Sequence, residues 1–225
     1  MSRAVLFDTE TTGLEPQLGH RVIEVAALEL LNDLPTGRHF HVLIDPQRDI
    51  PAEASRVHGF TSADLAGKPL FADIAAGLIE FFADSKLIAH NAPFDFGFLD
   101  MEFGRLGLPK LGQERMIDSL ALAKTRFPGM PNSLDALCRR FSIDLSARTT
   151  HNALLDCKLL AEVYVELTGG RQRGLSLAAQ DARGPVTVYV HTGPRTPHPI
   201  VPTEAELAAH AAFLTRIKEP VWLAP

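Results

Sequence analysis

The apolar and polar residues of the chain predict strands first, and then strands and helices in alternation. Short apolar runs predict strands, at residues 4–7, 21–31, 40–44, 87–89 and 116–117. Apolar residues three and four positions apart predict helices, at residues 70–82, 94–106, 134–141 and 151–167. The first three strands are close together and are expected to be antiparallel, whereas helices separate the later, parallel strands. This order predicts an α/β fold with a mixed central sheet flanked by helices.

Polar residues at the helix ends agree with these boundaries. Pro93 suits the first turn of the helix over 94–106, where its missing N–H costs nothing. Asp118 is expected to cap the helix that follows it, and either Asn132 or Ser133 is expected to cap the next one.

The composition changes at Gly169-Gly170, after which glycine and proline recur and a single strand-like run covers 186–190. Further on, Thr203 and Glu206 have the spacing of a capping box at the start of a helix. Chains rich in glycine and proline serve as tethers rather than as packed structure. We therefore expect a domain over 1–168, a linker over 169–202 and a flexible C-terminal tail with a docking helix over 203–225.

The composition is that of a globular protein with an acidic balance. The chain has 225 residues, of which 46% are hydrophobic, and a formal net charge of -5. Tight binding to nucleic acid requires clustered Lys and Arg, so a chain of this charge is expected to bind nucleic acid weakly unless a partner tethers it. No apolar run has membrane-spanning length and no signal peptide is evident, which predicts a cytoplasmic protein with no membrane partner. There, Cys138 and Cys157 are expected to be free, buried thiols.

Two carboxylates follow the first predicted strand. Asp8 and Glu10 are one residue apart, so in a strand both side chains lie on the same face. They repel each other unless a cation lies between them, and hard divalent cations such as Mg²⁺ prefer oxygen ligands. A pair of this kind by itself is better explained as ordinary surface acids at the end of a strand.

Three further residues are candidates for the same site. Asp95 lies in the first turn of a helix, where a negative charge is favourable even without a ligand. Asp156 shares a helical face with Leu160 and Val163, so its carboxylate needs a partner, either a metal ion or a neighbouring arginine. His151 is placed at the entrance of the same helix, where it is either a common surface histidine or an imidazole that takes a proton from water.

Together these residues predict a site that cleaves phosphodiesters with two metal ions. Asp8, Glu10, Asp95 and Asp156 would hold two ions about 3.5–4 Å apart, one to activate water and one to stabilise the leaving 3′-oxygen. His151 would act as the general base. Ordinary surface roles would have to apply to all five residues at once to defeat this interpretation.

The chain resembles the DEDD-type 3′→5′ exonucleases of the histidine subgroup, which have an RNase H-like fold. Within them it is similar to the epsilon proofreading subunits of bacterial DNA polymerase III. The matching strings run in the same order through residues 4–170, at 7–13, 19–24, 57–59, 90–95, 132–138, 151–156 and 160–164. The resemblance implies release of nucleoside monophosphates from a DNA 3′-end, and two divalent ions, Mg²⁺ or Mn²⁺.

The resemblance also implies which residues act. The metal ligands would be Asp8, Glu10, Asp95 and Asp156, with His151 as the base. Contacts with the 3′-terminal nucleotide are implied for Thr9, Leu14, Glu53, Val57 and His58. For the string 57–59 a simple turn is an equally good interpretation. Helix capping and a helix-surface position explain Asp118 and Asp135 better than a place in the site.

The tail also resembles that of the epsilon subunits. The string 172–177 has the form Q-x-x-L-x-L of a peptide that binds a sliding clamp, with Gln172, Leu175 and Leu177 as its anchors. The segment 203–222, which ends in the only tryptophan, Trp222, is similar to the region that binds the polymerase alpha subunit. A helix packed back on its own domain is the alternative. A small theta-like subunit is compatible with the resemblance, although no residue identifies it.

Two other functions are open at this point. An exonuclease that trims RNA or degrades oligonucleotides would have the same acids, and only the tail favours a polymerase partner. A non-catalytic binding or scaffold subunit on the same fold is less favoured, because every acid and the histidine of the site are present and the composition offers no basic groove.

Overall fold

The computed structural model of the chain describes residues 2–146, 148, 150–169 and 201–218. The chain divides into two compact units, residues 1–176 and 177–225, which are described separately. The predicted strand over 186–190 and the predicted partner anchors Gln172, Leu175, Leu177 and Trp222 lie outside the described residues. Our division at residues 168 and 202 stays a prediction.

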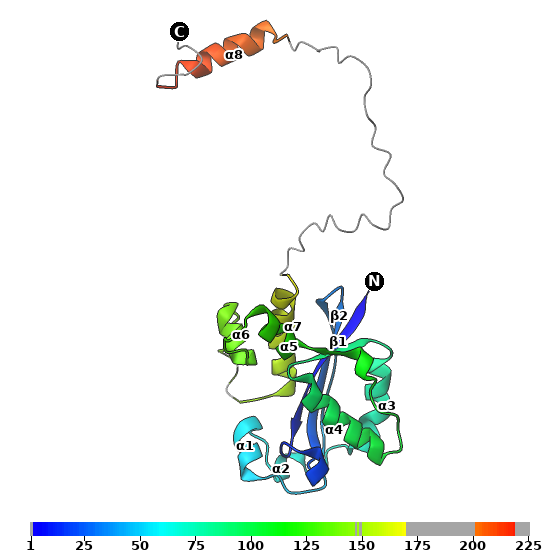
Figure 1. Cartoon of the computed structure of the whole chain (residues 1–225). Coiled ribbons are helices and arrows are strands. Elements are labelled where there is room, and N and C mark those ends of the chain that lie inside the picture. The colour runs from blue at the N-terminus through cyan, green and yellow to red at the C-terminus, as the bar shows by residue number, and fades with distance from the viewer. Residues whose placement is uncertain (1, 147, 149, 170–200, 219–225) are drawn as a thin grey trace. The chain divides into compact units, whose positions relative to one another are not determined.

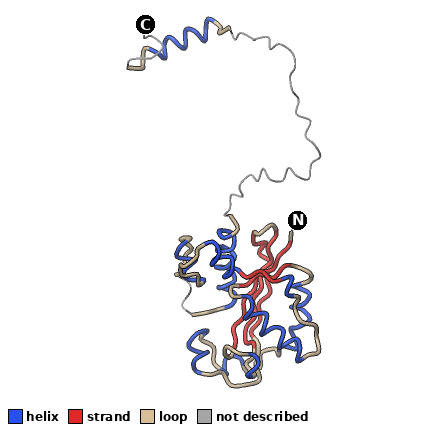
Figure 2. Tube along the Cα trace, in the orientation of Figure 1, coloured by secondary structure: helices blue, strands red, loops and turns tan. Residues whose placement is uncertain are grey.

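A five-stranded mixed sheet forms the centre of the first unit (Figures 1 and 2). Its strand order is β3 (Leu34–Leu43), β2 (Val22–Leu31), β1 (Arg3–Thr11), β4 (Lys86–Ala89) and β5 (Met116–Asp118). The β1–β2 and β2–β3 pairs are antiparallel, and the β1–β4 and β4–β5 pairs are parallel. Both expectations about strand direction are therefore confirmed.

Helices cover both faces of this sheet. Those of the first unit are α1 (Ala52–His58), α2 (Ser62–Leu65), α3 (Phe71–Phe82), α4 (Ala92–Arg105), α5 (Ser119–Arg126), α6 (Leu134–Arg140) and α7 (Ala153–Leu167), with 3₁₀ turns η1 (Pro16–Leu18) and η2 (Gln113–Arg115). Val5 and Phe7 of β1 pack toward α3 and α4. Ala4 and Leu6 point to the other face, toward α5, α6 and α7. Since side chains alternate along a strand, β1 contributes to two separate cores.

The second of these cores contains both cysteines. Cys138 of α6 and Cys157 of α7 are fully buried and free, as expected from the sequence. The predicted helix caps are also present: Asp118 accepts from the backbone N–H of Leu120, and Ser133, one of the two candidates, accepts from that of Ala136. Pro93 lies in the first turn of α4, as predicted.

Two local predictions differ from the structure. Strand β3 begins at Leu34 rather than at residue 40, because Asn32 and Asp33 both have positive φ and close a two-residue hairpin that extends the pairing to Leu31 and Leu34. Its first half is exposed, so it lacks the apolar alternation by which a strand is recognised. Helix α7 begins at Ala153 rather than at residue 151, since Asn152 is its N-cap.

Helices α1 and α2 were not predicted. Both are short, and α1 buries only His58, so neither has a periodic apolar face. The string 57–59, for which a turn was one interpretation, is the end of α1, where Gly59 adopts the left-handed conformation that glycine tolerates. Val57 and His58 therefore belong to the last turn of a helix.

The register of the sheet brings the predicted acids together. Strand β1 pairs with β4 only through residues Ala4, Val5 and Leu6, so Asp8 and Glu10 lie beyond the carboxyl end of β4. The chain leaves β4 at this same edge and enters α4, which carries Asp95 in its first turn. Crevices at the carboxyl ends of parallel strands are where α/β folds place their sites.

The second unit contains one described helix, α8 (Glu204–Leu214). Thr203 and Glu206 form the predicted capping box, in which each side chain accepts from the backbone N–H of the other residue. Leu207 and Phe213 of this helix are 53% and 55% exposed. Of the helices in the described part of the chain, none is both long and apolar enough to cross a membrane.

The core between β1 and α7 gives a test of the fold. Leu6 is fully buried there, whereas Leu122 of α5 is 42% exposed. Leu6→Ala is expected to lower the free energy of unfolding by about 3 kcal/mol, because it leaves a cavity in a packed core. Leu122→Ala, the control, should change it by less than about 1 kcal/mol. Urea denaturation measures both, and equal losses would contradict this assignment of the core.

Candidate active site

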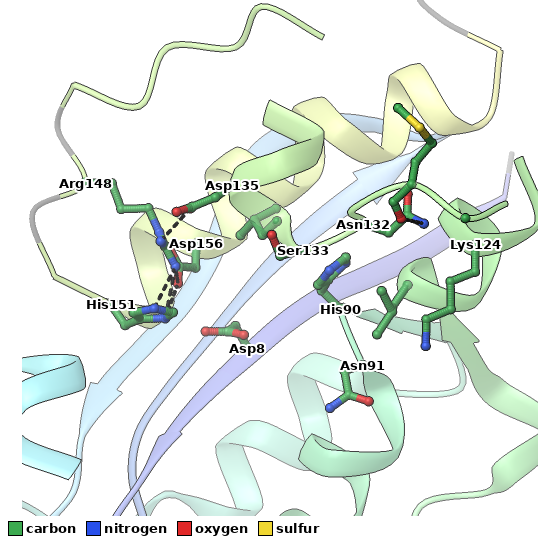
Figure 3. Close-up of a pocket in the computed structure, with 14 residues that line it drawn as sticks. Asp8, His90, Asn91, Lys124, Asn132, Ser133, Asp135, Arg148, His151 and Asp156 are labelled. Atoms are coloured by element: carbon green, nitrogen blue, oxygen red, sulfur yellow. Dashed lines mark hydrogen bonds and ion pairs between the residues drawn. The ribbon is translucent and has the colours of Figure 1, made fainter. Parts of the chain in front are cut away.

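The acids of β1 face helix α7. Asp8 and Glu10 continue the line of Ala4 and Leu6, the side chains that pack toward α7. Asp8 borders a cavity of about 920 Å³ that Arg148, His151 and Asp156 also line. Figure 3 shows these four side chains grouped at one end of the cavity. Asp8 and Glu10 therefore lie on one face of β1, as their spacing predicted, and this face is directed at α7, which carries Asp156.

Asp95 reaches the same place from α4. Its Oδ1 accepts hydrogen bonds from the backbone N–H of Thr9 at 3.1 Å and from the Thr9 hydroxyl at 2.7 Å. The turn that leads into α4 is held by Asp118, whose Oδ1 accepts from the N–H groups of Asn91 at 3.0 Å and Ala92 at 3.3 Å. Asp118 is thus a helix cap, as expected, that also fixes the approach of Asp95.

Glu24 positions the start of α7. Its side chain is fully buried on β2, directly opposite Glu10. One carboxylate oxygen accepts from the Asn152 amide at 3.0 Å and lies 2.7 Å from Nε2 of His41, and the other accepts from the N–H of Ala153 at 3.1 Å. These bonds tie the first turn of α7 to the sheet, and that turn carries Asp156.

The grouping of carboxylates changes their proton affinity. Burial raises the pKa of Asp8 well above its ordinary value, and the charges of Asp95, Glu10 and Asp156 raise it further. Burial and the neighbouring Glu24 raise the pKa of Glu10 to about 8. Burial also raises the pKa of Asp95 to about 7, against the effect of the hydrogen bonds from Thr9. Three neighbouring acids with raised pKa values mark a place where a positive charge would be favourable.

Asp156 differs from the other three acids because it has a cationic partner. Its two oxygens accept from Nε and Nη2 of Arg148 at 2.6 Å and 2.7 Å. Burial acts to raise the pKa of Asp156, but the hydrogen bond and charge of Arg148 hold it below its ordinary value. Of the two partners expected for this buried carboxylate, the structure contains the arginine. Among the described residues, Arg148 is the only cation that donates a hydrogen bond to any of the four acids.

His151 lies just before the N-cap of α7, with 49% of its side chain exposed, as its predicted position at the helix entrance requires. Its Nδ1 is 3.4 Å from Asp156 and accepts from Nη2 of Arg148 at 3.0 Å. One ligand atom each of Glu10, His151 and Asp156 lies within 4.8 Å of the others, close enough to hold a metal ion. The donor set of oxygens and one imidazole suits a divalent cation.

A second cavity, of about 570 Å³, adjoins Glu10. All five residues predicted to contact a terminal nucleotide line it, namely Thr9, Leu14, Glu53, Val57 and His58. Leu14 and Val57 are 79% and 48% exposed, so apolar surface borders the opening. The hydroxyl of Thr9 is already bonded to Asp95, which leaves its remaining surface to line the cavity.

His58 has one ring nitrogen available in this cavity. The ring is 4% exposed, and its Nδ1 accepts from the backbone N–H of Phe60 at 3.0 Å. The proton of a neutral imidazole is then on Nε2, which has no hydrogen-bond partner among the described residues. Burial lowers the pKa of His58, which favours this neutral form.

Several residues that line the site or hold it in place were not identified from the sequence. Arg148 and Glu24 are ordinary charged residues in sequence, and only their contacts reveal them. Phe94, which also lines the second cavity, was expected only as the first residue of a helix. Asp135 was expected on a helix surface, but its Oδ1 accepts from Nη1 of Arg148 at 2.7 Å at the edge of the first cavity.

Replacement of Glu24 tests how the start of α7 is held. Glu24→Ala leaves the N–H of Ala153 and the amide of Asn152 without their buried acceptor. The free energy of unfolding should fall by about 3 kcal/mol in chemical denaturation. As a control, Glu53→Ala removes an exposed pair with Arg56 and should cost less than about 1 kcal/mol. A loss as small as the control's would contradict the anchoring role.

The raised pKa values of Asp8, Glu10 and Asp95 predict how stability depends on pH without metal. The folded chain binds protons more tightly at these sites than the unfolded chain does, so stability should fall as pH rises from about 4.5 to about 8. Asp156, whose pKa is lowered, gives the opposite trend only below about 3.8. His58 and His90, whose pKa values burial lowers, reduce the slope below about 6.5 without reversing it, because three acids oppose them. Melting temperatures in EDTA measure this slope. Glu10→Gln should flatten it, and a melting temperature that rises across the window would refute the prediction.

Comparison with known proteins agrees with this geometry. The sequence matches the exonuclease family RNase_T over residues 5–164. It is 47% identical to the DNA polymerase III subunit epsilon of Rickettsia conorii over 96% of each chain. It is 40% identical to the subunit of the same name from Escherichia coli, over 97% of this chain and 95% of the relative.

A solved structure has the same fold. Exonuclease X in complex with 5′-overhanging duplex DNA is 27% identical, with a TM-score of 0.57 over 75% of this chain and 91% of that one. The predicted exonuclease fold is thereby confirmed. With its acids at the carboxyl ends of β1 and β4, the chain belongs to the exonuclease family and, within it, to the DNA polymerase III epsilon subunits.

Proposed function

We propose that this protein is a metal-dependent 3′→5′ exonuclease that removes mispaired nucleotides from a DNA 3′-end as the epsilon subunit of DNA polymerase III. The observation that carries the proposal is the convergence of Asp8, Glu10, Asp95 and Asp156, with His151, at one edge of the sheet. The relatives named as epsilon subunits, which match nearly the whole chain, support the polymerase assignment.

The donor set fits two divalent ions, Mg²⁺ or Mn²⁺. Asp8, Glu10, Asp95 and Asp156 would hold them, because three of these acids have raised pKa values and lack a cationic hydrogen-bond partner among the described residues. When bound, such ions supply positive charge to the phosphate and lower the pKa of water. The acidic net charge of the chain is then partly offset where the substrate binds.

The side chains around this cluster have separate tasks in hydrolysis. The oxygen of water attacks phosphorus, the bond from phosphorus to the 3′-oxygen of the penultimate nucleotide breaks, and that oxygen takes a proton from solvent and becomes a hydroxyl. His151 takes the proton of the water on a ring nitrogen, since it is half exposed at the mouth of the site. Thr9 keeps Asp95 in place, and Glu24 keeps the start of α7 in place.

The terminal nucleotide would occupy the cavity lined by Thr9, Leu14, Glu53, Val57 and His58. Leu14 and Val57 offer apolar contact to the base, and Nε2–H of His58 is a free donor for an oxygen of the nucleotide. Only an unpaired end fits such a cavity, because the base must leave the duplex to enter it. Fraying at a mismatch would then favour cleavage.

The names of the relatives also support the proposed partners and location. The polymerase alpha subunit would bind the segment 203–225, the sliding clamp would bind 172–177, and the exonuclease domain would cover 1–168. Exposed Leu207 and Phe213 of α8 are suited to a docking helix. A theta-like subunit is part of this proposal only by analogy with the family. The enzyme would work in the bacterial cytoplasm, with the replisome.

The deciding experiment is degradation of a 5′-labelled primer with a mispaired 3′-end, beside an RNA single strand of the same length, each with Mg²⁺ and with EDTA. We expect stepwise, metal-dependent shortening of the DNA and much slower loss of the RNA. Faster loss of RNA would identify an RNA-trimming enzyme instead. Absence of cleavage in both would point to a non-catalytic scaffold.

Variants of the acids test the assignment of the site. Asp8→Asn and Asp156→Asn should each reduce the cleavage rate at least about a hundredfold, because each removes a metal ligand. Circular dichroism should show an intact fold. Asp144→Asn, in an exposed loop after α6, is the matched control and should retain full activity. Full activity of either site variant would overturn the metal assignment.

A further inference from the structure

Arg148 makes an unusually complete set of contacts for a residue outside any helix or strand. Its side chain is only 10% exposed, and its three nitrogens are all used. Nε and Nη2 bond the two oxygens of Asp156 at 2.6 Å and 2.7 Å, which is the two-pronged geometry of strong Arg–carboxylate pairs. Nη1 donates to Asp135 at 2.7 Å.

The same guanidinium also engages His151. Nη2 donates to Nδ1 of the imidazole at 3.0 Å, as Figure 3 shows beside the bonds to Asp156. A ring nitrogen that accepts this bond has its lone pair occupied and is not free to take a proton from water. Arg148 thus forms hydrogen bonds both with Asp156, a proposed metal ligand, and with one ring nitrogen of His151, the proposed base.

These contacts compete with a metal ion. Asp156 and His151 belong to the group that, together with Glu10, brings its ligand atoms within 4.8 Å. Both oxygens of Asp156 accept hydrogen bonds from Arg148, so an ion that binds this carboxylate competes with the guanidinium for the same two oxygens. The positive charge of Arg148 also opposes the approach of a second cation.

We propose that Arg148 is an internal counter-cation of the metal-free site, which masks Asp156 and His151 until a divalent ion displaces it. The inference rests on the proposed function, since it takes Asp156 as a metal ligand. It makes Arg148 a positioning residue that controls metal affinity. Metal binding and release of the His151 imidazole become one coupled event, so the base is free only when the site is loaded.

Asp135 can hold the guanidinium of Arg148 after it leaves Asp156. Its carboxylate is 38% exposed at the start of α6 and is bonded to Nη1, the nitrogen that does not contact Asp156. The guanidinium keeps this bond when it leaves Asp156, so the exchange needs a change of side-chain rotamer and no movement of α7. An arginine has enough rotatable bonds for such a change.

The proposal has two linked consequences. Without metal, Arg148 stabilises the folded chain, because it neutralises one of four neighbouring acids. With metal bound, the ion neutralises the charge of these acids instead of Arg148. Loss of Arg148 should therefore destabilise the metal-free protein and strengthen metal binding at the same time, since a competing internal partner lowers the apparent affinity of a site. A purely structural ion pair would change stability equally with and without metal.

The test uses the full chain and Mn²⁺, with free Mn²⁺ followed by electron paramagnetic resonance at pH 7.5. Arg148→Gln should bind Mn²⁺ about tenfold more tightly than the natural chain. Its melting temperature should be lower in EDTA and should equal that of the natural chain at saturating Mn²⁺. Arg148→Lys keeps the charge but loses the two-pronged bond, so its affinity for Mn²⁺ and its melting temperature in EDTA should lie between those of the natural chain and Arg148→Gln. It also keeps the test possible if Arg148→Gln does not fold.

Arg3→Gln is the matched control. It removes a 2.7 Å pair with Glu29 at the opposite end of the same strand β1. Its melting temperature should fall equally with and without Mn²⁺, and its affinity for Mn²⁺ should not change. If Arg148→Gln binds Mn²⁺ no more tightly than the natural chain, the inference is overturned while the metal site stands. If the natural chain binds no Mn²⁺, the proposed metal site fails and the inference fails with it.

Discussion

Mutual repulsion of buried carboxylates is the constraint on which the rest of this site depends. Asp8, Glu10 and Asp95 converge where β1 extends past the end of β4. Burial raises the pKa values of all three, and the charges of neighbouring acids in the cluster raise those of Asp8 and Glu10 further. A folded protein is stable with such a cluster only if other contacts stabilise the fold and a cation neutralises the negative charge. The two cores on either side of β1 supply the first requirement, because they hold the strand between α3–α4 and α5–α7.

The surrounding polar contacts can be understood from the same constraint. Thr9, Glu24 and Asp118 do not belong to the acid cluster, yet each fixes a segment that carries one of its members. Arg148 supplies one positive charge to Asp156, the only one of the four clustered acids that has a cationic hydrogen-bond partner among the described residues. The site is therefore arranged in two layers, an inner group of acids that we propose as metal ligands and an outer group that determines where these acids point.

The sequence predicted the elements that have a periodic apolar face. The strand directions, the helices over 71–82 and 153–167, the caps at Asp118 and Ser133 and the capping box at Thr203 follow local rules, and the structure confirms them within a few residues. The exposed first half of β3 and the short helix α1 have no such face. Tertiary contacts stabilise them, so residue periodicity did not identify them.

The sequence by itself determined which residues are the candidates for the chemistry, because acids one residue apart in a strand and an acid on an apolar helix face need a cation wherever they meet. That they meet, and how each is neutralised, was decided by the tertiary structure. The register of β1 against β4 and the bonds of Glu24 to α7 bring distant segments together. Arg148 has no local pattern that distinguishes it from other surface arginines, since its role depends on contacts with Asp135, His151 and Asp156 that only folding creates.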